Sequence, residues 1–293
     1  MNAPDRLIQG MAEGGDFRII AAQTTNTVEA ARSLLDLSPV AADALGRALT
    51  GSLLLVRLLS KDLKHQYVTL RFEGDGPLGA VIAEANVAGA ARGFVENPVP
   101  VDQSLDVGRA IGAGMLSVVR GASAAGTPYT SQVSLSGSGI AQELTRYLAG
   151  SEQIASAVLL GVLNRREGVA AAGGIVIQAF PHASVQAIAR VEQRIKDAPP
   201  LSTLIEKMPI EDVVRMVLQG CDYKQIDASF NVPVSYACSC SRERALAPLA
   251  LFSDEERQEM IAQGGSDVTC QFCGRKYRFG ADDLRSLTAP ADA

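Results

Sequence analysis

The chain has 293 residues, of which 47% are hydrophobic, and a formal net charge of −5. This length predicts two domains with enough apolar content for a buried core, and the lack of tryptophan makes that core mainly aliphatic. The acidic balance argues against a nucleic-acid partner, because proteins that bind phosphate backbones usually present a basic face.

Neither a membrane span nor a secretory signal is expected. Crossing a bilayer takes roughly 18 apolar residues in a row, and Arg57 interrupts the best candidate, residues 51–59. The N-terminal stretch MNAPDRLIQGMAEGG contains acidic residues and lacks the apolar segment of an export signal. We therefore expect a cytoplasmic protein without a membrane partner, in a compartment that keeps thiols reduced.

Residues 1–183 are expected to form an α+β core domain, because strands follow one another and helices occur in separate blocks. A buried helix with Ser38 as N-cap begins at Pro39 and continues to Ser60, since its apolar residues lie nearly all round. Alternation and short apolar runs predict strands, and two further segments look helical. The strands are 16–22, 67–73, 81–83, 91–95, 115–119, 131–135 and 174–180, and the helices are 140–148 and 151–158.

Residues 184–235 are expected to form a helical linker. An amphipathic helix over 184–196 is followed by the breaker Ala-Pro-Pro at 198–200, a short helix over 201–208, and a helix that begins at Pro209 and ends at Gly220. The apolar stripes of these helices need a surface to lie against. The stripes of the last two helices include Ile205, Ile210, Val213, Val214 and Val217.

Residues 236–293 are expected to form a small separate domain. Ser241 can cap a helix that begins at Arg242, and residues 253–256 fit a capping box for a helix that two glycines end. Two short strands at 267–270 and 276–279 flank a turn. A last helix covers 282–287, and the tail after it is expected to be frayed.

Four of the five cysteines lie in this domain, in the pattern C-x-C…C-x-x-C-G: Cys238, Cys240, Cys270 and Cys273. The two-residue gap of the second pair lets both sulfurs face one ion, and the glycine after it permits the turn. Four thiolates suit a closed tetrahedral Zn²⁺ site. A unit of about 60 residues is marginally stable alone, so metal binding is expected to hold it folded.

The chemistry alone leaves three kinds of zinc site open. The first is a structural zinc, which can also act as an oxidation switch because thiolates are oxidised through sulfenic acid to disulfides. A plain structural zinc without a switch is the simpler interpretation. A zinc-ribbon adaptor for nucleic acid or protein is the second kind. A hydrolase or deaminase is the third, but it needs an open coordination position and a general base, and the pattern H-x-E…P-C-x-x-C is absent from the sequence.

Several other features are weaker candidates. The segment GDGPLG at 74–79 fits G-x-G-x-x-G, but Pro77 and the following strand favour a turn between strands. Cys221 is expected to be a half-buried thiol past a helix end. The two histidines, His65 and His182, are isolated and expected to lie at the surface.

The segment CSCSRER followed by CQFCGRKYRF resembles the zinc-binding region of the redox-regulated 33-kDa chaperonin family. Other segments are similar to further landmarks of that family, so the resemblance covers nearly the whole chain. These segments are LGRALTGSLLL, GDGPLGAVIAEAN, RGFVENP and AAGGIVIQAFP. It implies an ATP-independent holdase chaperone and not an enzyme.

The resemblance also implies a mechanism. In the reduced, inactive state Cys238, Cys240, Cys270 and Cys273 would bind one Zn²⁺. Oxidation would form the disulfides Cys238–Cys240 and Cys270–Cys273 and release the metal. The zinc domain and linker would then unfold, and the protein would form a homodimer and bind unfolded client proteins. The candidate client-binding residues are the linker residues Ile205, Ile210, Val213, Val214 and Val217. The resemblance thus favours the oxidation switch over a plain structural zinc.

Overall fold

The computed structural model describes residues 3–59, 66–102, 104–122, 128–225 and 231–287. The chain divides between Ala237 and Cys238 into two compact units, 1–237 and 238–293. Helices and strands are mixed in both, which confirms the predicted α+β class. The three-part division at 183 and 235 stays a prediction.

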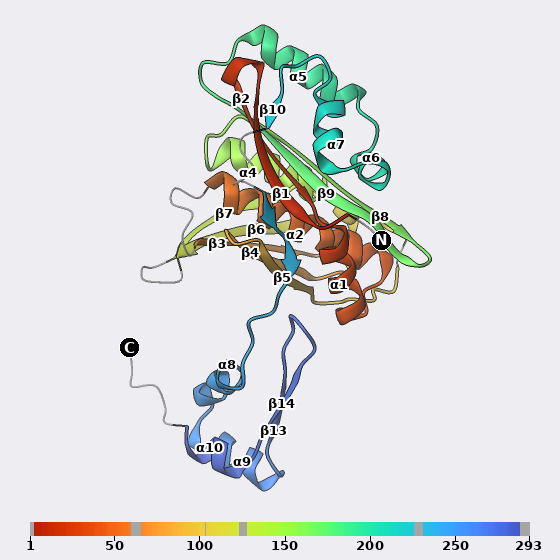
Figure 1. Ribbon diagram of the computed structural model, residues 1–293. Helices are drawn as coiled ribbons and strands as arrows, with labels where there is room; N and C mark the ends of the chain where they lie inside the picture. The colour runs from red at the N-terminus through yellow and green to blue at the C-terminus, as the bar shows by residue number, and fades with distance from the viewer. Residues whose placement is uncertain (1–2, 60–65, 103, 123–127, 226–230, 288–293) are drawn as a thin grey trace. The chain divides into compact units, whose positions relative to one another are not determined.

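Two sheets form the frame of the N-terminal unit (Figure 1). Within each sheet neighbouring strands pair antiparallel, except β12 with β5, which pair parallel. The first sheet has the order β10 (Lys224–Gln225), β1 (Arg6–Ala12), β2 (Phe17–Gln23), β9 (Gly168–Ala179) and β8 (Ser156–Arg165), with β11 (Val232–Pro233) also on β1. The second has the order β12 (Ser235–Tyr236), β5 (Ala90–Val95), β4 (Ala80–Asn86), β3 (Gln66–Gly74), β6 (Gly114–Ala122) and β7 (Tyr129–Leu135).

Helix α2 (Pro39–Leu59) lies between the two sheets and packs against β3 and β4 on one side and β8 and β9 on the other. Its apolar residues are buried all round, as the sequence predicts, and the Ser38 side chain accepts a hydrogen bond from the Ala41 amide. The expected last residue, Ser60, lies outside the described part. The shorter helices of this core are α1 (Thr25–Leu35), α3 (Val107–Ile111) and α4 (Ile140–Gly150), with a 3₁₀ turn, η1 (Glu13–Gly15).

Within the described residues α2 is a helix long and apolar enough to cross a membrane by length and composition alone, and Arg57 lies within it. However, 83% of its most apolar window is buried inside the protein. The helix is as apolar as a membrane-spanning helix because the two sheets enclose it.

Three linker helices cover the other face of the first sheet: α5 (Val185–Asp197), α6 (Leu201–Lys207) and α7 (Ile210–Val217) (Figure 1). Alternate residues of β2 face opposite ways, so Ile19 packs with these helices and Ile20 packs in the cluster around α2. The expected helices are confirmed, and the Ser184 side chain caps α5 by accepting from the Ala187 amide. The apolar stripes therefore find their surface within the N-terminal unit.

The predicted helix over 151–158 is wrong. Residues 151–155 form a turn and loop in which Gln153 has a φ of 56°, and strand β8 begins at Ser156. The apolar run VLLGVL pairs antiparallel with β9, and this pairing outweighs its helical pattern. The sequence patterns also failed to predict strand β1 and helices α1 and α3. The expected turn at GDGPLG, between β3 and β4, is confirmed.

The C-terminal unit contains α8 (Arg242–Leu246), η3 (Ala247–Leu251), α9 (Asp254–Ala262), a hairpin of β13 (Ser266–Thr269) and β14 (Lys276–Phe279), and α10 (Ala281–Arg285). Both predicted caps are present, at Ser241 and at the Ser253 capping box. Among the described residues its buried apolar cluster consists of Leu249, Phe279 and Leu284, and partly buried side chains such as Met260 and Val268 pack against it. The tail predicted to be frayed lies outside the described residues.

Candidate metal centre

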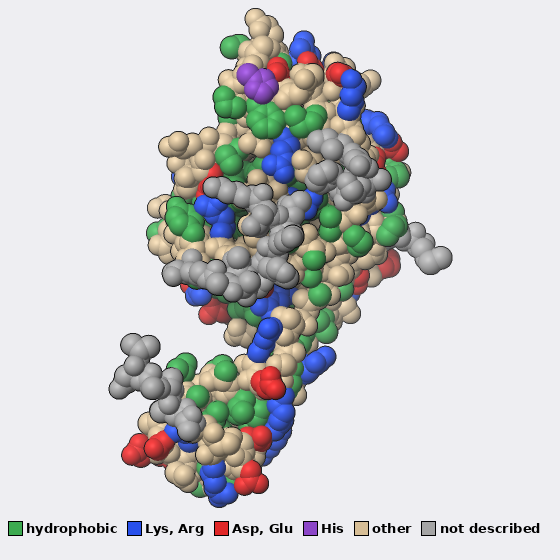
Figure 2. Space-filling model, turned by 60° about the vertical axis from the view of Figure 1, so that its left-hand side comes forward, with side chains coloured by type: hydrophobic (Ala, Val, Ile, Leu, Met, Phe, Trp, Pro, Cys, Tyr) green, Lys and Arg blue, Asp and Glu red, His purple; other side chains and the backbone are tan. Residues whose placement is uncertain are grey.

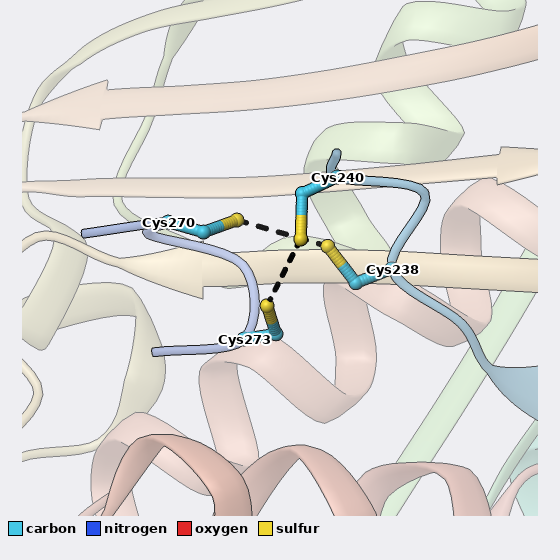
Figure 3. Close-up of side chains that lie close together, drawn as sticks. All are labelled: Cys238, Cys240, Cys270 and Cys273. Carbon is cyan, nitrogen blue, oxygen red and sulfur yellow. Dashed lines mark hydrogen bonds between the residues drawn. The ribbon is translucent and has the colours of Figure 1, made fainter. Parts of the chain in front are cut away.

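The four predicted cysteines converge at one point of the C-terminal unit (Figure 3). Their sulfurs all lie within 4.8 Å of one another. Two sulfur–sulfur contacts link the pairs: 3.7 Å from Cys238 to Cys270 and 3.4 Å from Cys240 to Cys273. Sequence spacing therefore identified a true spatial cluster.

The second cysteine pair is held by a tight turn after β13. The Cys273 and Gly274 amides both donate to the Cys270 carbonyl, and the Cys270 amide donates to the Arg275 carbonyl. Gly274 has a φ of 67°, a left-handed conformation that residues with a Cβ adopt at a cost. This glycine is the one that the sequence pattern predicted to permit the turn.

The first pair lies in the loop before α8. Ser241 ends this loop by capping the helix, since its hydroxyl accepts from the Arg244 amide at 3.2 Å. The Arg244 side chain returns to the loop and donates to the carbonyl and hydroxyl oxygens of Ser239, the residue between the two cysteines. A helix start thus fixes the backbone that presents Cys238 and Cys240.

The sulfur spacing fits a tetrahedral ion. Four sulfurs each about 2.3 Å from a central Zn²⁺ would be about 3.8 Å apart. The contacts of 3.7 and 3.4 Å are close to this value. They are far longer than the roughly 2.05 Å of a disulfide, and all five cysteines are free thiols. The donor set and its size therefore suit a closed metal site.

The environments of the sulfurs differ. The Tyr277 hydroxyl donates to the Cys240 sulfur at 3.1 Å and lowers the pKa of that thiol to about 7, because the hydrogen bond favours the thiolate. Burial raises the pKa of Cys238 to about 12, and burial also raises the pKa of Cys273. Sequence reasoning missed Tyr277. Its position two residues before the buried Phe279 on β14, on the same face of the hairpin, was the available signal.

The other sequence candidates lie away from the cluster or beside it. Arg242 at the start of α8 forms an ion pair with Asp283 of α10 and lies over the Phe279 ring. Cys221 is half-buried in the N-terminal unit, as predicted, and burial raises the pKa of its thiol. His182 is exposed, as predicted, and His65 lies outside the described residues.

The family model described as "Hsp33 protein" matches residues 5–280 of the chain. The chain belongs to the Hsp33 family. It is 44% identical to the 33 kDa chaperonin of a Thermus thermophilus strain over 97% of this chain and 86% of that protein. It is 37% identical to the 33 kDa chaperonin of Deinococcus radiodurans over 96% of this chain and 97% of that protein.

The fold is also that of a solved Hsp33 structure. The crystal structure of the 33 kDa chaperonin from Thermotoga maritima superposes with a TM-score of 0.85 at 32% identity, covering 97% of this chain and 98% of that one. The resemblance read from the cysteine region is therefore confirmed along nearly the whole chain, and the protein is a chaperone of the Hsp33 family.

Proposed function

We propose that this Hsp33 protein is a redox-regulated, ATP-independent holdase that acts in the cytoplasm, with no enzymatic activity and no nucleic-acid or membrane partner. The observation that carries the proposal is the convergence of four thiols, all within 4.8 Å of one another, in a unit with a small buried core. In the reduced state Cys238, Cys240, Cys270 and Cys273 would hold one Zn²⁺, which joins the loop before α8 to the β13–β14 turn.

The metal would be the main source of order in the C-terminal unit. Among its described residues the buried apolar cluster has three members, with partly buried side chains packed around it, whereas structural zinc binding supplies about 10–16 kcal/mol in apparent terms. Loss of the metal should therefore unfold the unit rather than loosen one loop. A domain with this property is readily switched by thiol chemistry.

Oxidation would remove the ligands in pairs. Each disulfide forms when two thiols lose two electrons and two protons to an oxidant such as hydrogen peroxide, which is reduced to two waters. In a tetrahedral site all sulfur pairs are nearly equidistant, so the distances within the cluster do not choose between pairings. The family resemblance implies the pairs Cys238–Cys240 and Cys270–Cys273, and the short loops between these cysteines would keep both sulfurs close once the unit unfolds.

The linker supplies a surface that such unfolding would uncover. Five apolar linker residues pack against the first sheet and are each at most 5% exposed: Ile205, Ile210, Val213, Val214 and Val217. On the face shown in Figure 2, hydrophobic side chains occur in small groups separated by charged and polar ones. We propose that these five residues contact clients after the linker is released, and that the active form is a homodimer.

The test compares the reduced and oxidised states of the full chain. Zinc-loaded protein is treated with peroxide, and released zinc, remaining thiols and suppression of aggregation of an unfolding client are measured together. We expect one zinc released and four thiols lost as protection appears. Equal protection by the reduced, zinc-bound form would show that the switch is wrong.

A further inference from the structure

Residues 232–237 extend both sheets of the N-terminal unit at once (Figure 1). Strand β11 pairs antiparallel with β1, placing Val232 opposite Leu7. Two residues later β12 pairs parallel with β5, placing Tyr236 opposite Ala91. A single short segment therefore covers main-chain groups at the edges of β1 and β5.

Main-chain hydrogen bonds hold the segment. The amides of Val234, Ser235 and Ala237 donate to the carbonyls of Asp5, Gly89 and Ala91 at 3.1, 3.1 and 2.8 Å. Such bonds depend on an extended backbone and not on the identity of the side chains.

The Tyr236 hydroxyl takes the place of the strand that would come next. It donates to the Gly93 carbonyl at 2.8 Å and accepts from the Gly93 amide at 3.4 Å. In a longer parallel strand these two groups of Gly93 would pair with the main chain of the following residues. The β5 edge thus has unused pairing capacity that one side chain covers.

The side chains of the segment alternate. Val232, Val234 and Tyr236 pack against the main core cluster, whereas Pro233 and Ser235 are exposed. Val234 is the most buried of the three, at 7% exposure, and the other two are half-buried. The contact surface therefore accepts apolar residues at every second position and places no demand on those between them.

We propose that the edges of β1 and β5 are a docking site for an extended segment of an unfolded protein with apolar residues at alternate positions, and that residues 232–237 occupy this site in the reduced state. The inference rests on the proposed holdase function and names the class of client. Cys238 follows Ala237 directly, so an ordered metal centre anchors the end of the segment. Unfolding of that unit removes the anchor and frees the edges for strand addition.

Peptide backbone chemistry tests the mode of binding. Three fluorescent peptides with valine at alternate positions are each titrated with the oxidised full chain. The first is unmodified, the second carries N-methyl groups on the amides of one strand edge, and the third carries them on the amides of the other edge. We expect the peptide methylated on the pairing edge to bind at least about tenfold more weakly, since it loses several hydrogen bonds but no apolar surface. Equal affinity of all three peptides, or no binding, overturns the inference. Suppression of client aggregation by the same sample tests the holdase function separately.

The position of the site is tested by crosslinking. A photoreactive residue replaces Ala90 on β5, which lies opposite the exposed Ser235, and the control replaces Thr130 on β7 at the other edge of the second sheet. We expect the peptide to label the Ala90 variant after oxidation and not the Thr130 variant. Equal labelling of both overturns the placement.

A variant of the segment tests competition. Tyr236→Phe removes both hydrogen bonds to Gly93, so the reduced, zinc-bound chain should bind the peptide about three- to tenfold more tightly than the parent. Tyr129→Phe is the control, because Tyr129 lies on β7 and contacts Arg120 through its ring. An unchanged affinity of Tyr236→Phe, with zinc retained, counts against the segment as the competing ligand.

Discussion

Replacing Cys270 by serine should unfold the C-terminal unit without oxidant. The buried side chains Leu249, Phe279 and Leu284 would together contribute about 5–9 kcal/mol, at about 1.5–3 kcal/mol for each. A structural zinc contributes about 10–16 kcal/mol in apparent terms. A bound zinc would therefore stabilise the unit more than these three side chains do, and a site with three thiolates should not hold the unit together.

The assay is amide hydrogen exchange on the reduced full chain, with zinc content measured on the same sample. We expect Cys270→Ser to lose zinc and to lose amide protection throughout residues 238–287, while the two sheets of the N-terminal unit keep theirs. Cys221→Ser is the matched control, because Cys221 lies in the other unit and outside the cluster. Native protection in Cys270→Ser without bound metal would refute the reasoning.

Three further predictions concern single side chains. Gly274→Ala should lower the stability of the C-terminal unit by about 1–2 kcal/mol in thermal unfolding, because φ is 67° there, whereas Gly280→Ala, at a φ of −88° in open space, should change little. Tyr277→Phe removes the hydrogen bond to the Cys240 sulfur. Loss of such a partner weakens metal binding, so peroxide-driven zinc release should be about three- to tenfold faster, and an unchanged rate would contradict this role. Burial opposes ionisation of Glu143, but hydrogen bonds from two serines outweigh the effect of burial and lower the pKa of Glu143 from 4.5. The Glu143 carboxylate therefore stabilises the fold fully above pH 4.5, and this contribution is lost as the pH falls through the folded pKa. Glu143→Gln should therefore lose roughly 1.5–3 kcal/mol in urea unfolding at pH 7 and less below pH 4, and a pH-independent loss would show that the charge is not involved.

The sequence by itself predicted the cysteine cluster and the local signals around it. The C-x-C and C-x-x-C-G spacings, the capping residues Ser241 and Ser253, and the period of the linker helices are all short-range features. Each is set by neighbours within a few residues, so each could be predicted without knowing the fold.

The tertiary structure decided the elements whose partners lie far away. The run after residue 155 is a strand because β9 lies beside it, and α2 can be apolar all round because two sheets enclose it. The two-residue strands β11 and β12 carry no pattern long enough to be recognised from sequence. Their places on β1 and β5 follow only from main-chain pairing between residues more than a hundred positions apart, which no local pattern encodes.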